Sequence, residues 1–101
     1  MNIIVLDNLV NNTSSNSEGF VLFNELKRCL NRGQKVILEI SGESTLSSSF
    51  LNSSIGEYLD NFGMETFKEN VKIKSNKNQF QRLSKYLSNY SKVYGNRIPE
   101  I

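Results

Sequence analysis

The chain has 101 residues, of which 38% are hydrophobic and 22% are charged, and its net charge is +2. These values are typical of one globular domain. No stretch approaches the roughly 20 apolar residues that span a bilayer, and the start, MNIIVLDN, lacks the basic region of a secretory signal. We therefore expect a soluble cytoplasmic protein.

The sequence contains no histidine and one cysteine, Cys29. The lack of histidine excludes Ser-His and Cys-His nucleophilic catalysis and histidine metal ligation. A lone cysteine forms neither an intramolecular disulfide nor a zinc-binding cluster, and Cys29 falls on the apolar stripe of a predicted helix, where we expect a buried thiol. The composition predicts neither an enzyme nor a bound cofactor or metal.

The first predicted unit is a strand followed by a helix. Residues 2–6 (NIIVL) are apolar and rich in β-branched side chains, which predicts a strand. Residues 7–17 are rich in turn formers and predict a loop. Ser17 is the expected N-cap of a helix over residues 18–31, which Gly33 ends.

The second predicted unit repeats this order. Residues 35–40 (KVILEI) give the strongest strand signal, and their near-continuous apolar character predicts a strand covered on both faces. A loop over residues 41–46 leads to an amphipathic helix over residues 48–62. Gly63 ends this helix, and residues 64–70 predict a short helical turn.

The third predicted unit begins with residues 71–75 (VKIKS), whose alternation indicates a strand with one solvated face. Asn76 or Asn78 is the expected cap of a helix that runs to about Lys92. Residues 93–101 predict an extended tail because they contain glycine and proline.

Together these elements predict a single α/β domain over residues 1–101, with the order β-α-β-α-β-α. Strands that alternate with helices indicate a mostly parallel sheet with right-handed crossovers. Three strands are few for such a sheet. Either the tail or residues 8–13 add a strand, or a second copy of the chain completes the sheet as a homodimer.

Charge is distributed unevenly along the chain. Residues 1–63 carry a net charge of −3 and residues 64–101 one of +5. Basic residues interleaved with aromatic ones can bind nucleic acid, whereas a tyrosine stripe also fits half-buried packing. The residues concerned are Lys68, Lys72, Lys74, Lys77, Arg82 and Lys85, with Tyr86, Tyr90 and Tyr94.

Three consecutive serines, Ser47, Ser48 and Ser49, open the second predicted helix. One of them suffices to cap the helix. The positive end of the helix dipole would also stabilise a phosphate on a remaining hydroxyl.

Acidic residues near this turn offer a different chemistry, because paired carboxylates bind metals or act as acid and base. Their spacing is more typical of ordinary solvated charges, and no glycine-rich phosphate-binding loop accompanies them. The residues are Glu39, Glu43, Glu57 and Asp60.

Four segments in this order resemble the bacterial STAS-like domain family of unknown function. The resemblance spans roughly residues 17–87 and implies a small STAS-like fold. Its most specific element is SSFL at residues 48–51, followed by Gly56 and a helix-ending glycine. The segments are residues 20–33, 36–42 (VILEISG), 47–63 (SSSFLNSSIGEYLDNFG) and 71–87 (VKIKSNKNQFQRLSKYL).

The wider STAS family includes anti-sigma-factor antagonists, in which a partner kinase phosphorylates a serine just after a central strand. This resemblance implies that Ser49 is the modified serine, with Ser48 as the alternative, and that the partner is an ATP-binding histidine-kinase-like protein. The chain departs from the pattern at Ser47, where the family has an acidic residue, and at Phe50, where it has glycine. Phe50 either packs inward and locks the helix start or is an exposed anchor for a partner.

We interpret the chain as a bacterial regulatory protein–protein interaction module. Its predicted partner surface is the loop after the second strand and the start of the following helix, with a serine switch, an apolar anchor or hinge and two rim contacts: Ser48, Ser49, Phe50, Glu43 and Asn52. The alternatives are a nucleic-acid-associated accessory protein that uses the basic C-terminal helix, or a small-ligand binder at the strand ends.

Overall fold

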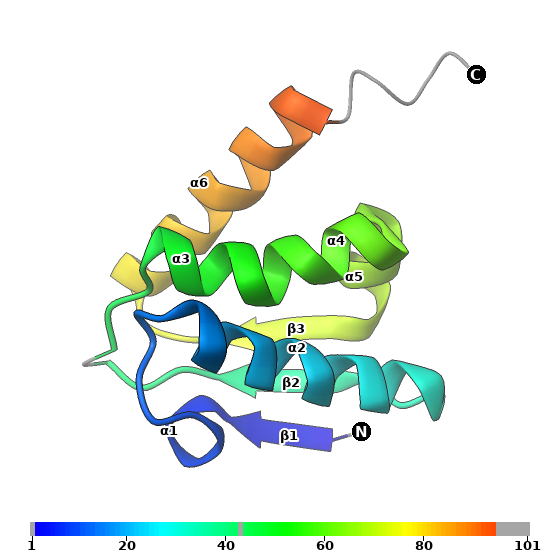
Figure 1. Ribbon diagram of the computed structural model, residues 1–101, viewed down its shortest axis with the longest axis horizontal. Helices are drawn as coiled ribbons and strands as arrows, with labels where there is room; N and C mark the ends of the chain where they lie inside the picture. The colour runs from blue at the N-terminus through cyan, green and yellow to red at the C-terminus, as the bar shows by residue number, and fades with distance from the viewer. Residues whose placement is uncertain (1, 43, 95–101) are drawn as a thin grey trace.

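The computed structural model describes residues 2–42 and 44–94 and shows an α/β domain (Figure 1). The elements follow the predicted alternation of strands and helices. In chain order they are β1 (Asn2–Val5), α1 (Leu6–Leu9), α2 (Asn16–Asn31), β2 (Val36–Glu39), α3 (Ser48–Leu51), the π-helical turn η1 (Asn52–Gly56), α4 (Glu57–Phe62), α5 (Met64–Asn70), β3 (Val71–Lys74) and α6 (Lys77–Tyr94).

Within these residues the sheet has three parallel strands in the order β1-β2-β3. The connection from β1 to β2 and the connection from β2 to β3 both cross the sheet in the same direction. Because such connections are right-handed, the helices within them lie on the same face of the sheet. Burial confirms this, because Ile4 and Leu38 are buried whereas Ile3 on the opposite face is 61% exposed. The expectation that β2 is covered on both faces was wrong: Ile37 and Glu39 lie on the open face and remain partly exposed.

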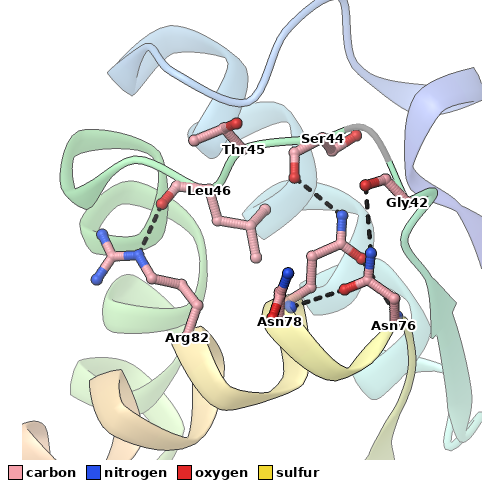
Figure 2. Close-up of a pocket in the computed structure, with 8 residues that line it drawn as sticks. Gly42, Ser44, Thr45, Leu46, Asn76, Asn78 and Arg82 are labelled. Carbon is pink, nitrogen blue, oxygen red and sulfur yellow. Dashed lines mark hydrogen bonds between the residues drawn. The ribbon is translucent and has the colours of Figure 1, made fainter.

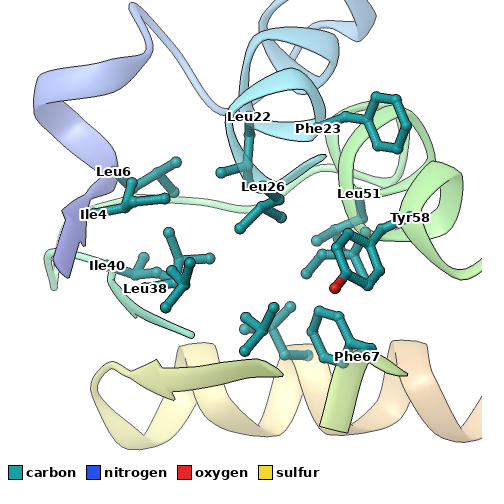
Figure 3. Close-up of a cluster of buried hydrophobic side chains, with 14 of the residues drawn as sticks. Ile4, Leu6, Leu22, Phe23, Leu26, Leu38, Ile40, Leu51, Tyr58 and Phe67 are labelled. Carbon is teal, nitrogen blue, oxygen red and sulfur yellow. The ribbon is translucent and has the colours of Figure 1, made fainter. Parts of the chain in front are cut away.

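The hydrophobic core fills the space between the covered sheet face, α2 and the continuous helix formed by α3, η1 and α4 (Figure 3). Cys29 is buried in it, as expected. The ring of Tyr58 packs edge-on against Phe62 and Phe67, at centroid distances of 5.1 and 5.6 Å. Burial raises the pKa of Tyr58, whose hydroxyl has no hydrogen-bond partner among the described residues.

The segment before α2 differs from the loop predicted over residues 7–17. The chain forms the short helix α1 there, and the side chain of Asn12 accepts hydrogen bonds from the amides of Ser14 and Ser15. This turn makes Ser15, rather than Ser17, the N-cap of α2, because its hydroxyl accepts from the amide of Glu18 at 3.3 Å. Residues 8–13 add no strand to the sheet.

The predicted helix over residues 48–62 is confirmed, with a π-helical turn at its centre. Within this turn, the buried hydroxyl of Ser54 donates to the carbonyl of Phe50 at 2.7 Å. Gly63 ends the helix with a φ of +90°, which favours glycine.

The last helix, α6, begins at the predicted cap. Asn76 accepts a hydrogen bond from the amide of Gln79 at 2.8 Å, and the Gln79 side chain accepts from the amide of Asn76, as in a capping box. The helix continues to Tyr94, so Val93 is helical rather than part of the predicted tail. Residues 95–101 lie outside the described residues. None of the helices described is long and apolar enough to cross a membrane.

Candidate functional site

The serine turn lies between β2 and α3, and Ser47 is its capping residue. The hydroxyl of Ser47 accepts a hydrogen bond from the amide of Phe50 at 3.1 Å, and its amide donates to the carbonyl of Thr13 at 3.1 Å. The capping role that the sequence left open among three serines therefore belongs to Ser47. Ser48 and Ser49 follow as the first two residues of α3, and both are exposed.

Arg82 of α6 reaches this turn from the far end of the sequence. Its Nε atom donates to the carbonyl of Leu46 at 2.9 Å (Figure 2). Its Nη2 atom donates to the hydroxyl of Ser48 at 3.2 Å. The guanidinium is thereby fixed beside one of the two exposed serines. The sequence identified Arg82 only as one of several basic residues, and no spacing in it joins Arg82 to Ser48.

The start of α6 also holds the loop that leads to the turn. The Gln79 side chain, only 5% exposed, donates to the carbonyls of Ser41 and Ser44, the latter at 2.9 Å. Asn76 donates to the carbonyl of Gly42 at 3.2 Å (Figure 2). The sequence carries no local signal for this role, because Gln79 and the loop carbonyls that it binds are 35 and 38 residues apart along the chain.

A cavity of about 290 Å³ lies between this loop and α6, lined in part by Thr45 and Asn78 (Figure 2). Its lining donors on Asn76, Gln79 and Arg82 already bind loop carbonyls. The cavity therefore gives little support to a small-ligand site at the strand ends.

A family model for the STAS-like domain of unknown function (DUF4325) matches residues 18–81, which is more than half of the chain. The chain belongs to this family. The matched segment includes most of α2 together with β2, the serine turn and β3, and it ends one residue before Arg82. No curated protein and no solved structure matches the chain.

In this STAS-like domain the side chain of Phe50 packs inward, which is one of the two arrangements predicted for it. Its side chain is 1% exposed and belongs to the core cluster beneath α3. An exposed anchor for a partner is therefore not what the structure shows. The aromatic side chain instead locks the start of the helix onto the core.

Asn52, a predicted rim contact, is exposed and lies one turn after Ser48. Its side-chain oxygen accepts a hydrogen bond from the hydroxyl of Tyr86 at 2.8 Å. Both residues line a groove of about 270 Å³ between α3 and α6, together with Ser48 and Arg82. The structure thus brings Ser48 and Asn52 to one surface. Glu43, the other predicted rim contact, lies outside the described residues.

Glu39, Glu57 and Asp60, which the sequence offered as paired carboxylates, have separate partners in the STAS-like domain. Glu39 pairs with Lys74 at 3.4 Å across the open sheet face. Asp60 accepts from the hydroxyl of Tyr90 at 2.5 Å, and Glu57 accepts from Asn61. Over residues 2–42 and 44–94, no group of three histidine, cysteine or acidic side chains is placed to hold a metal ion.

The basic residues singled out in the C-terminal half lie on three elements. Half of them are on α6, as that alternative requires, and the others are on α5 and on the open sheet face: Lys77, Arg82 and Lys85, against Lys68, Lys72 and Lys74. Tyr86 and Tyr90 are half-buried and donate hydrogen bonds to the α3–η1–α4 helix, so these two tyrosines pack within the domain. The side chain of Tyr94 lies outside the description. This arrangement gives the nucleic-acid alternative no specific support.

Proposed function

We propose that this STAS-like domain is a non-enzymatic regulatory module that binds a protein partner and is switched by phosphorylation at the serine turn. The observation that carries the proposal is the division of roles among the three serines. Ser47 caps the helix, while Ser48 and Ser49 expose hydroxyls that the fold does not need for capping. A modifying enzyme can therefore reach them without opening the core.

The two exposed serines differ in their surroundings. A phosphate carries a charge of about −1.5 to −2, and on Ser48 it would lie beside the guanidinium of Arg82, which already contacts the hydroxyl. Arg82 would neutralise part of that charge within the domain. On Ser49 the phosphate would face outward. Ser49 is therefore our first choice for a switch that repels an acidic partner surface, and Ser48 is the alternative.

The proposed partner is an ATP-binding histidine-kinase-like protein, by analogy with the wider STAS family. Such a protein would bind the exposed part of the turn and the neighbouring groove, and it would also be the source of the phosphate. Because the phosphate donor is ATP, we place the domain in the cytoplasm. The buried Phe50 contributes to this surface only indirectly, by fixing the backbone of α3.

The Ser49→Asp variant should weaken the binding of a partner captured from the native host by roughly tenfold or more, because a like charge at an interface costs more than 1.4 kcal/mol. The measurement is affinity capture with the tagged domain, followed by titration of the captured protein against each variant. Ser48→Asp should have a smaller effect, because Arg82 lies beside it.

A matched control exists in α2. Ser17 is also exposed and is also the second residue of a helix that a serine caps. Ser17→Asp therefore adds the same charge at the same helix position, and it should leave partner binding unchanged. If both Ser48→Asp and Ser49→Asp bind the partner as tightly as the wild type does, the switch is wrong.

A further inference from the structure

The sheet ends at β1 with an open edge. Among the described residues no strand pairs with its outer side, and its apolar side chains reach solvent: Ile3 is 61% exposed and Val5 is 37% exposed. A strand edge of this kind is a template for pairing with another strand.

The backbone of β1 is oriented for such pairing. The amide of Asn2 donates to the carbonyl of Lys35 at 2.8 Å, so Asn2 and, by alternation, Ile4 direct their hydrogen-bonding groups toward β2. The amide and carbonyl of Ile3 consequently point away from the sheet. A groove of about 310 Å³ runs along this edge, lined in part by Ile4 and Leu9. It leaves room for a side chain of an added strand next to Ile4.

Charge distinguishes the two edges of the sheet. The other end strand, β3, carries the exposed residues Lys72 and Lys74. Lys74 pairs with Glu39 on β2, but two copies of Lys72 would still face each other as like charges, which disfavours the pairing of β3 with a second β3. The sequence of β1, NIIV, carries no charge. Glu25, which also lines the groove, forms an ion pair with Arg28, and this hydrogen-bonded guanidinium lowers the pKa of the carboxyl.

We propose that β1 is a dimer interface in which two copies of the chain pair their β1 strands antiparallel about a two-fold axis. The pairing joins two three-stranded sheets into one of six strands and buries Ile3 and Val5 against their counterparts. An isologous contact of this kind closes on itself, whereas pairing of β1 with β3 of the next copy would continue without end. The last turn of α6 lies on the side of the molecule away from β1, so it does not cover the edge (Figure 1).

The dimer would have a defined effect on the serine turns. Each turn follows the C-terminal end of β2, and antiparallel pairing directs these ends in opposite directions. The two turns would therefore lie at opposite ends of the joined sheet. Each would remain accessible to its own partner, so dimerisation is independent of the proposed switch.

Sedimentation velocity over a range of concentrations tests the proposal. We expect the wild type to sediment with twice the mass of the chain. Ile3→Lys should raise the dimer dissociation constant by roughly tenfold or more. The variant places two like charges across the two-fold axis, and it removes apolar surface that the dimer would bury. Val93→Lys is the matched control, since Val93 is 58% exposed on α6, and it should leave the dimer unchanged.

A second variant tests the backbone contribution. Ile3→Pro removes an outward-pointing amide and none of the hydrogen bonds to β2, so the fold should persist, as circular dichroism would show, while the dimer dissociates. A wild type that stays monomeric up to about 1 mM overturns the proposal. A dimer that survives both Ile3 variants, or one that Val93→Lys disrupts, overturns it as well.

Discussion

Replacing Gly19 with alanine should lower the free energy of unfolding by about 1–3 kcal/mol, although alanine favours helix over glycine. A Cβ atom at this position would lie 2.6 Å from the carbonyl oxygen of Phe50 and 2.7 Å from the Cβ of Ser53. Both contacts are with rigid parts of the neighbouring helix. Gly19 therefore sets how closely α2 packs against α3 and η1, and any side chain there forces the helices apart.

Gly56 provides the comparison. A Cβ atom there would meet the hydroxyl of Tyr86, which is the end of a flexible side chain. Gly56→Ala should therefore lower the free energy of unfolding by less than Gly19→Ala does. The side chain of Tyr86 can move away from the new methyl group, and this movement breaks its hydrogen bond to Asn52. Urea denaturation of both variants measures the difference. Equal stability of Gly19→Ala and the wild type would contradict the close packing of α2.

The second large effect is expected from Phe50→Ala, which should cost about 3–5 kcal/mol because it leaves a cavity in the core. That is a substantial part of the 5–15 kcal/mol by which domains are usually stable. The side chain is 1% exposed, and the residue follows the three serines directly in α3. We expect a lower urea midpoint and a partly unfolded protein at moderate temperature.

Phe80→Ala is the matched control, because Phe80 is 54% exposed on α6 and its truncation should change stability little. If Phe50→Ala kept wild-type stability and lost only partner binding, Phe50 would be an exposed anchor after all. Comparison of the two phenylalanine variants by denaturation and by partner capture separates these outcomes.

The sequence predicted the order of elements because each strand and helix has a local signal. A few neighbouring residues suffice to predict each of these features: the apolar run of β2, the apolar stripe of α2 and the glycines after α2 and α4. The open face of β2 could not be predicted, because an apolar run does not show how many faces of the strand are covered. That depends on the direction of both crossovers, which is a property of the whole sheet.

The site was predicted in part for the same reason. The serine turn follows from local sequence, and the family pattern pointed to Ser48 and Ser49. The roles of Gln79 and Arg82 depend on contacts 34 to 38 residues away along the chain. No periodicity connects these positions. The capping role of Ser47 was open for a related reason, since any of three neighbouring hydroxyls satisfies the same sequence rule.

The most direct test of the proposed switch is phosphosite mapping by mass spectrometry on the protein isolated from its native host, with free and partner-bound fractions analysed separately. We expect a phosphate on Ser49, or on Ser48, in the free fraction and an unmodified serine turn in the partner-bound fraction. An unmodified turn in both fractions under all growth conditions, or equal phosphorylation in both, would contradict the proposed switch.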